Sequence, residues 1–338
     1  MAILEILDVL RRGQDVAMRA QARGRRLACR MLHATLALIV ATVCEGVSAQ
    51  DLKQPGPLEV ESVKDSLFMI SGEGGNVAVL LTDDGVVLID NMFERNHDDI
   101  VDVVAGLADA PIRYVLNTHQ HDDHAGGVRR LLPFTEVIAH ENVRFNLSDL
   151  RQPYYEDTPG LPVGLPELTF SDAFSVYVGG EVVRARYFGR GHTNGDAVIY
   201  FPSRRTIHTG DLFIARGSLN IYADYAQGGS LLEWADTVDG ILMLDFDTII
   251  PGHGPLATRQ DLVDFRSALA QMVERVRGLI AAGATKAQIA AVFEADYGWR
   301  STGCPPSPPT PGCLQFQQLD ALIDELGTSL ARDRVPLP

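Results

Sequence analysis

The sequence predicts an α/β fold, a four-layer αββα sandwich in which two sheets pack face to face with helices outside. Two batches of short apolar segments indicate the two sheets, and segments with helical spacing accompany each batch. The chain has 338 residues, of which 46% are apolar, so it can build one large domain or two modest ones.

The first sheet is predicted from alternating or continuous apolar runs in the N-terminal half. These runs cover residues 58–63, 67–70 and 76–91. The pair Asp84-Gly85 in the last run is typical of a hairpin turn. Residues 96–110 have helical spacing with Asn96 as the N-cap, and residues 113–118 follow as a buried strand.

The second sheet is predicted from four later runs. They cover residues 175–178, 181–188, 197–201 and 205–210. The remaining predicted elements are helices over 125–132, 140–147, 231–244, 262–281 and 316–326 and strands over 136–139 and 247–250. Residues 151–168 contain four prolines and cannot form regular structure, so we expect them to be a substrate-facing loop.

The N-terminal region has the pattern of an export signal. Arginines from Arg23 to Arg30 precede an apolar run over 32–43, and Val47-Ser48-Ala49 precedes a cleavage point at Gln50. A run of about twelve residues is too short to span a bilayer, which disfavours an uncleaved anchor and a stable membrane span in the mature chain. We therefore expect a periplasmic or secreted protein.

Four parts of the chain are predicted. They are a leader over 1–49, a linker over 50–57, a main domain over 58–285 and a helical C-terminal extension over 286–338. The extension contains a Pro-rich loop between Cys304 and Cys313. In an oxidising compartment these cysteines can form a disulfide, and two unpaired cysteines are the alternative.

The charge distribution argues against nucleic-acid partners. Residues 1–49 contain seven Arg, no Lys and four acidic residues, so the rest of the chain contains 22 basic and 40 acidic residues. An acidic body of this kind repels phosphate backbones. A small-molecule substrate is expected instead, and the oligomeric state is left open.

The chemistry is concentrated in the stretch NTHQHDDHAGG, residues 117–127, at the end of a predicted strand. In extended backbone, residues two apart project the same way, so His119 and His121 can bind one ion. Asp123 and His124, after the turn, can reach a second.

Three further candidate ligands stand at strand ends beside glycines. They are His192 in GRGHTNGD, Asp211 in HTGDLF and His253 in PGHGP. Imidazole and carboxylate groups are zinc ligands, and a catalytic zinc keeps a bound water. Two ions that share this water lower its pKa toward neutrality, which provides a nucleophile at neutral pH.

HQHDDH resembles the HxHxDH signature of the metallo-β-lactamase superfamily, and the downstream histidines and aspartate follow in that family's order over roughly residues 58–260. The resemblance implies an αββα fold with the metals at one edge. It also implies a ligand set: His119, His121 and His192 for the first zinc, Asp123, His124 and His253 for the second, and Asp211 bridging both.

One departure from the family pattern affects the expected substrate. The best-known zinc β-lactamases have Cys where this chain has Asp211, and Lys where it has Ile214. Asp211 instead resembles the bridging aspartate of glyoxalase II and the lactonases. Arg216 could replace the lysine as a carboxylate anchor, although a solvated surface arginine is the favoured interpretation.

The expected activity is zinc-dependent hydrolysis by an exported dinuclear enzyme. A metal-bridging hydroxide would cleave an ester, thioester, lactone or related acyl bond, and Asp123 would take up or deliver a proton while ligating. The alternatives are a β-lactamase acting on β-lactam antibiotics and a small-molecule phosphodiesterase. A zinc-binding or electron-transfer module is a further alternative, and the ligand types also suit iron or manganese.

Several residues near these motifs have two interpretations each. Asp90 either hydrogen-bonds beside the site or forms a turn. Thr118 is expected to be a buried hydroxyl bonded to backbone. The tyrosines expected either to line a pocket or to pack beneath the loops are Tyr154, Tyr155, Tyr222 and Tyr225. The histidines expected to be structural are His97, His140 and His208.

Overall fold

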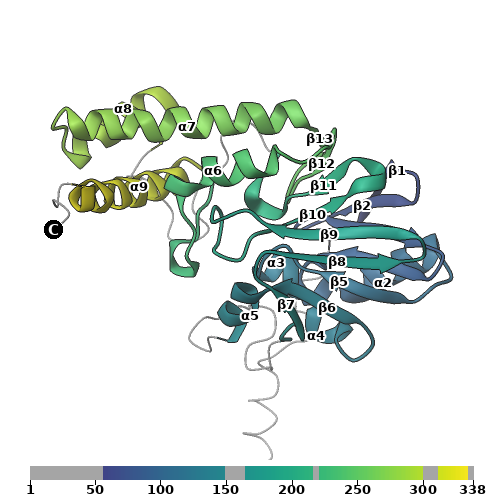
Figure 1. The fold of residues 1–338 in the computed structure, drawn as a ribbon. Coiled ribbons are helices and arrows are strands. Elements are labelled where there is room, and N and C mark those ends of the chain that lie inside the picture. The colour runs from purple at the N-terminus through teal and green to yellow at the C-terminus, as the bar shows by residue number, and fades with distance from the viewer. Residues whose placement is uncertain (1–55, 149–163, 216–220, 300–310, 334–338) are drawn as a thin grey trace, which may run out of the picture. The chain divides into compact units, whose positions relative to one another are not determined.

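The computed structural model describes residues 56–148, 164–215, 221–299 and 311–333 (Figure 1). The described residues exclude the predicted leader and most of the predicted linker. They also exclude most of the predicted substrate-facing loop over 151–168. The side chains of Cys304 and Cys313 lie outside the described residues as well. The division of the chain into four parts stays a prediction.

The first sheet contains seven strands in the same order in space as in sequence. They are β1 (Glu59–Lys64), β2 (Leu67–Ser71), β3 (Val77–Thr82), β4 (Gly85–Ile89), β5 (Ile112–Leu116), β6 (Glu136–His140) and β7 (Leu168–Phe170). β1 to β4 pair antiparallel, and the predicted hairpin at Asp84-Gly85 is confirmed as the β3–β4 connection. β4 to β7 pair parallel, so the carboxyl ends of β5 and β6 lie at one edge.

The second sheet contains six strands, in the spatial order β13-β12-β11-β10-β9-β8. They are β8 (Ala173–Val178), β9 (Glu181–Tyr187), β10 (Ala197–Phe201), β11 (Thr206–His208), β12 (Thr248–Ile250) and β13 (Ala257–Thr258). Only the β11–β12 pair of this sheet is parallel.

Alternation of side chains along the strands produces the layers. Ala78 and Leu80 on β3 pack against residues of the second sheet such as Ile199, in one buried cluster between the sheets. Val77 and Val79 point the other way and pack against the helices that cover the first sheet. The predicted αββα sandwich is therefore confirmed.

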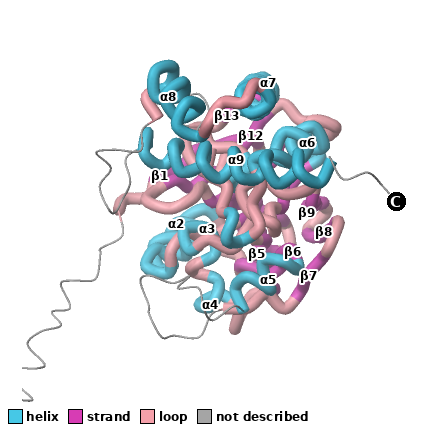
Figure 2. Tube along the Cα trace, turned by 90° about the vertical axis from the view of Figure 1, so that its left-hand side faces the viewer, coloured by secondary structure: helices cyan, strands magenta, loops and turns pink. Residues whose placement is uncertain are grey.

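Helices cover the outer faces of the two sheets (Figure 2). Those on the side of the first sheet are α2 (His97–Leu107), α3 (Asp122–Ala125), α4 (Val128–Leu131) and α5 (Glu141–Ser148). Those on the side of the second sheet are α6 (Leu231–Ile241), α7 (Arg259–Ala281), α8 (Lys286–Tyr297) and α9 (Pro311–Asp333). Short 3-10 turns are η1 (Glu94–Asn96), η2 (Pro202–Arg204), η3 (Gly210–Leu212) and η4 (Tyr225–Gln227).

The last two helices share the core of the second sheet. Phe293 on α8 and Leu322 on α9 belong to the same buried cluster as Ile207 and Trp234. Among the described helices, none combines the length and apolar character needed to cross a membrane.

Three local expectations differ from the structure. The helix predicted over 125–132 is two short helices, α3 and α4, separated by Gly126-Gly127. Asn96 precedes α2, but its side chain makes no capping hydrogen bond within the described residues. α8 has no counterpart among the predicted helices, although Thr285 and Gln288 form a capping box at its start.

Candidate metal centre

The candidate ligands lie at strand ends from both sheets. β5 ends at Leu116, an extended stretch carries His119 and His121, and α3 begins at Asp122. The loop between β9 and β10 carries His192, and η3, after β11, carries Asp211. The loop after β12 carries His253. Each side chain thus extends from a short connection that a rigid strand holds in place.

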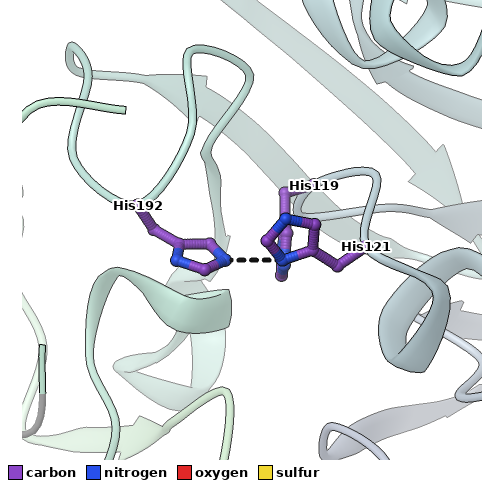
Figure 3. A group of neighbouring side chains, drawn as sticks. All are labelled: His119, His121 and His192. Carbon is purple, nitrogen blue, oxygen red and sulfur yellow. Dashed lines mark hydrogen bonds between the residues drawn. The ribbon is translucent and has the colours of Figure 1, made fainter. Parts of the chain in front are cut away.

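These seven side chains come together in three overlapping groups. Within each group the ligand atoms lie within 4.8 Å of one another. The groups are His119, His121 and His192; His119, His124 and Asp211; and Asp123, His124 and His253. Figure 3 shows the first group, with imidazoles from two separate loops pointing at each other.

Outer partners determine which nitrogens of the first group carry protons. His192 Nδ1 lies 2.5 Å from the carbonyl oxygen of Tyr222, and His121 Nε2 lies 3.0 Å from Asp224 Oδ2. Because a carbonyl and a carboxylate accept hydrogen bonds, each of these nitrogens is assigned a proton. His192 Nε2 and His121 Nδ1 then face each other at 2.8 Å with lone pairs (Figure 3).

The third imidazole of this group has the same polarity. Thr118 Oγ1 donates to Asp90 Oδ2 over 2.7 Å, so its lone pair accepts from His119 Nδ1 at 3.0 Å. His119 Nε2 is buried and has no hydrogen-bond partner among the described residues. Three imidazole lone pairs therefore converge on one point, which fits a metal ion better than it fits hydrogen bonding among the rings.

The second group is defined as Asp123, His124 and His253 together with Asp211, and it is built around two carboxylates. His124 Nε2 lies 3.2 Å from Asp211 Oδ1 and 3.8 Å from Asp123 Oδ2. His253 Nε2 lies 3.1 Å from Asp123 Oδ2 and 3.5 Å from Asp211 Oδ1. Asp211 Oδ2 also lies 3.7 Å from His192 Nε2, so this carboxylate faces both groups.

Electrostatics differ between the two groups. Burial, together with neighbouring imidazoles, holds the pKa of His119 well below its usual value and lowers the pKa of His192 to about 4. These two rings are therefore neutral at pH 7, and neutral imidazole is the form that binds metal.

In the second group the carboxylates dominate. Burial lowers the pKa of His124, but Asp211 and Asp123 outweigh it and raise this pKa well above its usual value. Burial also lowers the pKa of His253, but Asp211 outweighs it and raises this pKa to about 9. Burial raises the pKa of Asp123, but His124 and His253 outweigh it and lower this pKa to about 2. The two carboxylates favour positive charge here, which either protons or a metal ion can supply.

Asp90 supports both groups from behind, and the expectation of a hydrogen-bonding role beside the site is confirmed. Its Oδ2 accepts from His124 Nδ1 over 2.8 Å and from the Thr118 hydroxyl, and its Oδ1 accepts from the Thr118 amide. The expectation for Thr118 was wrong, because its hydroxyl donates to this carboxylate rather than to backbone. Asp90 has a φ of 62°, a conformation that Asp and Asn tolerate better than most residues.

Sequence reasoning missed Asp224 and the carbonyl group of Tyr222. Asp224 binds His121, and burial opposes but does not prevent the lowering of its pKa by that hydrogen bond. In the sequence, Asp224 lies four residues before the pair Gly228-Gly229, a pattern that is typical of a turn. In the structure it forms the N-cap of η4. A carbonyl group leaves no sequence signal.

Two glycines keep the centre open. A Cβ at Gly75 would collide with the His124 imidazole, and a Cβ at Gly252 would collide with Asp211 Oδ1. The Gly75 amide also donates to the Asp123 carbonyl over 2.9 Å. Only glycine allows the backbone to approach these side chains so closely.

A cavity of 520 Å³ adjoins the second group, because its lining includes Gly74 and Gly254 from the loops beside Asp123 and His253. The cavity is also lined by Glu59, Glu61 and Glu73. Glu73 forms an ion pair with Arg95, at 3.0 Å. The cavity wall is therefore more suited to neutral or cationic groups than to anionic ones.

The other residues named from sequence are distributed as follows. Tyr222 is 36% exposed, and its ring lies 5.7 Å from that of His192, beside the centre. The Tyr225 hydroxyl donates to Glu325 on α9, away from the centre. His208 is buried and bonds the Asn76 carbonyl, as expected for a structural histidine. Tyr154, Tyr155 and Arg216 lie outside the described residues.

The side chains of both groups fit metal ions in their ligand types and in their separations. Zinc lies about 2.0 to 2.2 Å from each ligand atom, so its ligands can lie about 3 to 4 Å apart. The separations of 2.8 to 3.8 Å within the two groups are of this size.

Comparison with known proteins agrees with this geometry. The family model of the metallo-beta-lactamase superfamily matches residues 70–253. The metallo-beta-lactamase type 2 of Bacillus cereus is 24% identical over 202 residues, which cover 58% of this chain and 74% of that protein. The metallo-beta-lactamase IND-1 of Chryseobacterium indologenes is 24% identical over 181 residues, covering 53% and 71%.

Solved structures share the fold. The metallo-beta-lactamase from Pontibacter korlensis has a TM-score of 0.54 and 21% identity, and the match covers 63% of this chain and 99% of that one.

Proposed function

We propose that this chain, which belongs to the metallo-beta-lactamase superfamily of hydrolases, is an exported dinuclear zinc enzyme that cleaves an ester, thioester, lactone or related acyl bond. The observation that carries the proposal is the pair of lone pairs on His121 Nδ1 and His192 Nε2, 2.8 Å apart beside the unpartnered His119 Nε2, as described above. Iron or manganese would suit the same ligands, so zinc is the part of the proposal that metal analysis tests.

Each side chain has a defined role in this proposal. His119, His121 and His192 hold one ion, Asp123, His124 and His253 hold the other, and Asp211 faces both. When bound, the two ions would supply Lewis acidity and an activated water. The low pKa of Asp123 keeps this carboxylate ionised at neutral pH, which is the form that binds a metal ion, but also makes it a weak proton acceptor.

The acidic cavity supports a neutral acyl substrate. Glu59 and Glu61 would repel the phosphate of a diester or the carboxylate of a β-lactam antibiotic. The position of Ile214, where β-lactamases have a lysine, agrees with this preference. β-Lactam hydrolysis is the second candidate, and it is favoured by the similarity to the metallo-beta-lactamases of Bacillus cereus and Chryseobacterium indologenes.

The proposal is tested by hydrolysis assays on zinc-loaded protein with and without a chelator. The panel contains an aryl ester, a lactone, S-lactoylglutathione, nitrocefin and bis(p-nitrophenyl) phosphate. We expect turnover of at least one of the first three compounds, lost on chelation and restored by zinc. The uncharged ester and lactone should be preferred over S-lactoylglutathione, whose carboxylates the cavity wall would repel. Turnover of nitrocefin alone would favour the second candidate, and inactivity of the metallated protein on the whole panel would refute both.

A matched pair of histidine variants controls the assay. His192→Gln should abolish turnover because it removes one lone pair from the first group. His97→Gln replaces a histidine at the start of α2, away from the centre, and should retain wild-type turnover. Export is tested separately, by finding the chain in the periplasmic or culture fraction and sequencing its N-terminus.

A further inference from the structure

The segment Ile221–Asp224 separates the metal centre from the C-terminal helix α9. Ile221 and Ala223 are buried, with 0% and 2% of their surface exposed. Both the centre and α9 form hydrogen bonds with this segment, so it connects the helix to the ligands.

The edge of the segment that faces the centre pairs with His192. The Tyr222 carbonyl accepts from His192 Nδ1 over 2.5 Å, and the Asp224 amide donates to the His192 carbonyl over 2.7 Å. The Asp224 carboxylate binds His121 Nε2 at 3.0 Å. Two of the three imidazoles of the first group, those of His192 and His121, are thus oriented by Tyr222 and Asp224, which are two positions apart on the segment.

The opposite edge pairs with two glutamines on α9. Gln315 Nε2 donates to the Ile221 carbonyl over 2.8 Å, and Gln318 Oε1 accepts from the Ala223 amide over 2.8 Å. The glutamines are three positions apart, on one face of the helix. They are 6% and 5% exposed, and they take the place of a neighbouring strand.

A third residue of α9 fixes the end of the loop that follows. Glu325 accepts from the Tyr225 hydroxyl over 3.0 Å, from the Ser230 hydroxyl over 2.5 Å and from the Leu232 amide over 3.2 Å. Ser230 caps α6, and a carboxylate at this helix N-terminus is favourable. The same helix therefore holds both the segment and the loop that follows it.

Packing alone does not account for the two glutamines. Burying an amide is costly unless its hydrogen bonds are satisfied, and Gln315 Oε1 is buried with no hydrogen-bond partner among the described residues. Apolar side chains beside Leu319 and Leu322 would avoid this cost. An apolar residue would, however, leave the Ile221 carbonyl or the Ala223 amide unpaired. The glutamines thus serve the backbone of the segment.

We propose that Gln315 and Gln318 are positioning residues for the three-histidine metal group. They hold Ile221–Asp224 so that the Tyr222 carbonyl and the Asp224 carboxylate fix the orientation of His192 and His121. This inference rests on the proposed function, in which those histidines bind metal. Partners that orient a ligand in this way typically contribute about 10- to 100-fold in metal affinity.

The test measures zinc affinity of the full chain by competition with a chromophoric chelator. The double variant Gln315→Met/Gln318→Met is made in two backgrounds, each leaving one intact group. His253→Ala leaves the three-histidine group, and His121→Ala leaves Asp123, His124 and His253. We expect about 10-fold weaker zinc binding or more in the first background and unchanged binding in the second.

Gln317→Met is the matched control, because Gln317 is exposed on the same helix and should leave both affinities unchanged. Far-UV circular dichroism of the apoprotein checks folding. Two single variants remain informative if the double variant unfolds. Gln318→Glu keeps an acceptor for the Ala223 amide, whereas Gln315→Glu places an acceptor against the Ile221 carbonyl, so only the second should weaken zinc binding strongly.

Unchanged zinc affinity of the double variant in the His253→Ala background would overturn the inference. Equal losses of affinity in both backgrounds, or equal effects of the two glutamate variants, would also overturn it. Those results leave the proposed function intact. If instead the wild-type chain binds no zinc, the proposed function itself fails, and the inference fails with it.

Discussion

Asp90 connects the two metal groups at the level of hydrogen bonds. It bonds His124 directly and reaches His119 through the Thr118 hydroxyl, so one carboxylate sets the tautomer of a ring in each group. Its burial is complete, with 0% of its surface exposed, so solvent does not compete for these bonds.

Asp90→Asn is predicted to weaken binding of both metal ions by about 10- to 100-fold. Asparagine keeps the tolerance for positive φ, so the backbone should be preserved, but its single acceptor oxygen cannot serve all the donors that face Asp90. Zinc affinity measured by chelator competition checks this. Asp102→Asn, on the exposed side of α2, is the control, and wild-type affinity in Asp90→Asn would contradict the prediction.

Residue chemistry was predictable where a ligand carries its own signal. The spacing HxHxDH and the three Gly-flanked motifs identified residues that the structure brings within a few ångströms of one another. Asp224, the Tyr222 carbonyl and Gln318 were not predicted. Their roles depend on which backbone groups face them across the fold, and no local pattern encodes that.

At the scale of elements, strands were easier to predict than helix ends. Alternation in β3 and β4 produced both the pairing and the two buried faces, because each strand faces two apolar layers. α8 was missed because its faces are weakly segregated: Ile289 and Phe293 are the residues of this helix that the core buries. Two glycines stand at the break between α3 and α4. Gly126 approaches Asp122 too closely for a side chain, and Gly127 lies tightly against Asn91.

The β2–β3 connection positions the second metal group through Gly75. Gly75→Ala is predicted to displace His124, because the new methyl group would occupy the space of its imidazole. Turnover and the binding of the second ion should both be lost. Metal content and turnover of the purified variant check this.

Gly106→Ala is the control for this substitution. Gly106 lies in α2, and no heavy atom among the described residues beyond its own helix lies within 4 Å of the new methyl group. Alanine in a helix is more stable than glycine by roughly 0.5 to 1 kcal/mol, so this variant should be active and slightly stabilised. Equal activity of the two alanine variants would contradict the role assigned to the loop.

At the scale of the whole molecule, the family and the αββα fold were both predicted and both confirmed. The leader, the linker and the four-part division stay predictions. The C-terminal helices extend the sandwich rather than standing apart from it, since α8 and α9 complete the buried cluster over the second sheet.

The two metal groups should respond differently to pH. The raised pKa values of His124 and His253, the latter about 9, mean that both rings are protonated at pH 7 before metal binds. Metal at the second group must displace these protons, so its affinity should increase from pH 6 to pH 9. His119 and His192 are already neutral in this range and release no protons.

Calorimetric titration of apoprotein with zinc, in buffers of different ionisation enthalpy, measures this proton release. The ion that binds at the three-histidine group should cause little proton release from His119 and His192. The ion that binds at the second group should release protons from both His124 and His253. Greater release with the first ion than with the second would contradict the assignment of charge to the two groups.

In the proposed enzyme, two sets of side chains meet at Asp211 and each set holds one metal ion. Zinc content per chain after reconstitution and gel filtration, measured by mass spectrometry, tests it most directly. We expect two ions per wild-type chain and one ion in each of His192→Gln and His253→Gln. Fewer than two ions in the folded wild-type protein, or two ions in either variant, would contradict it.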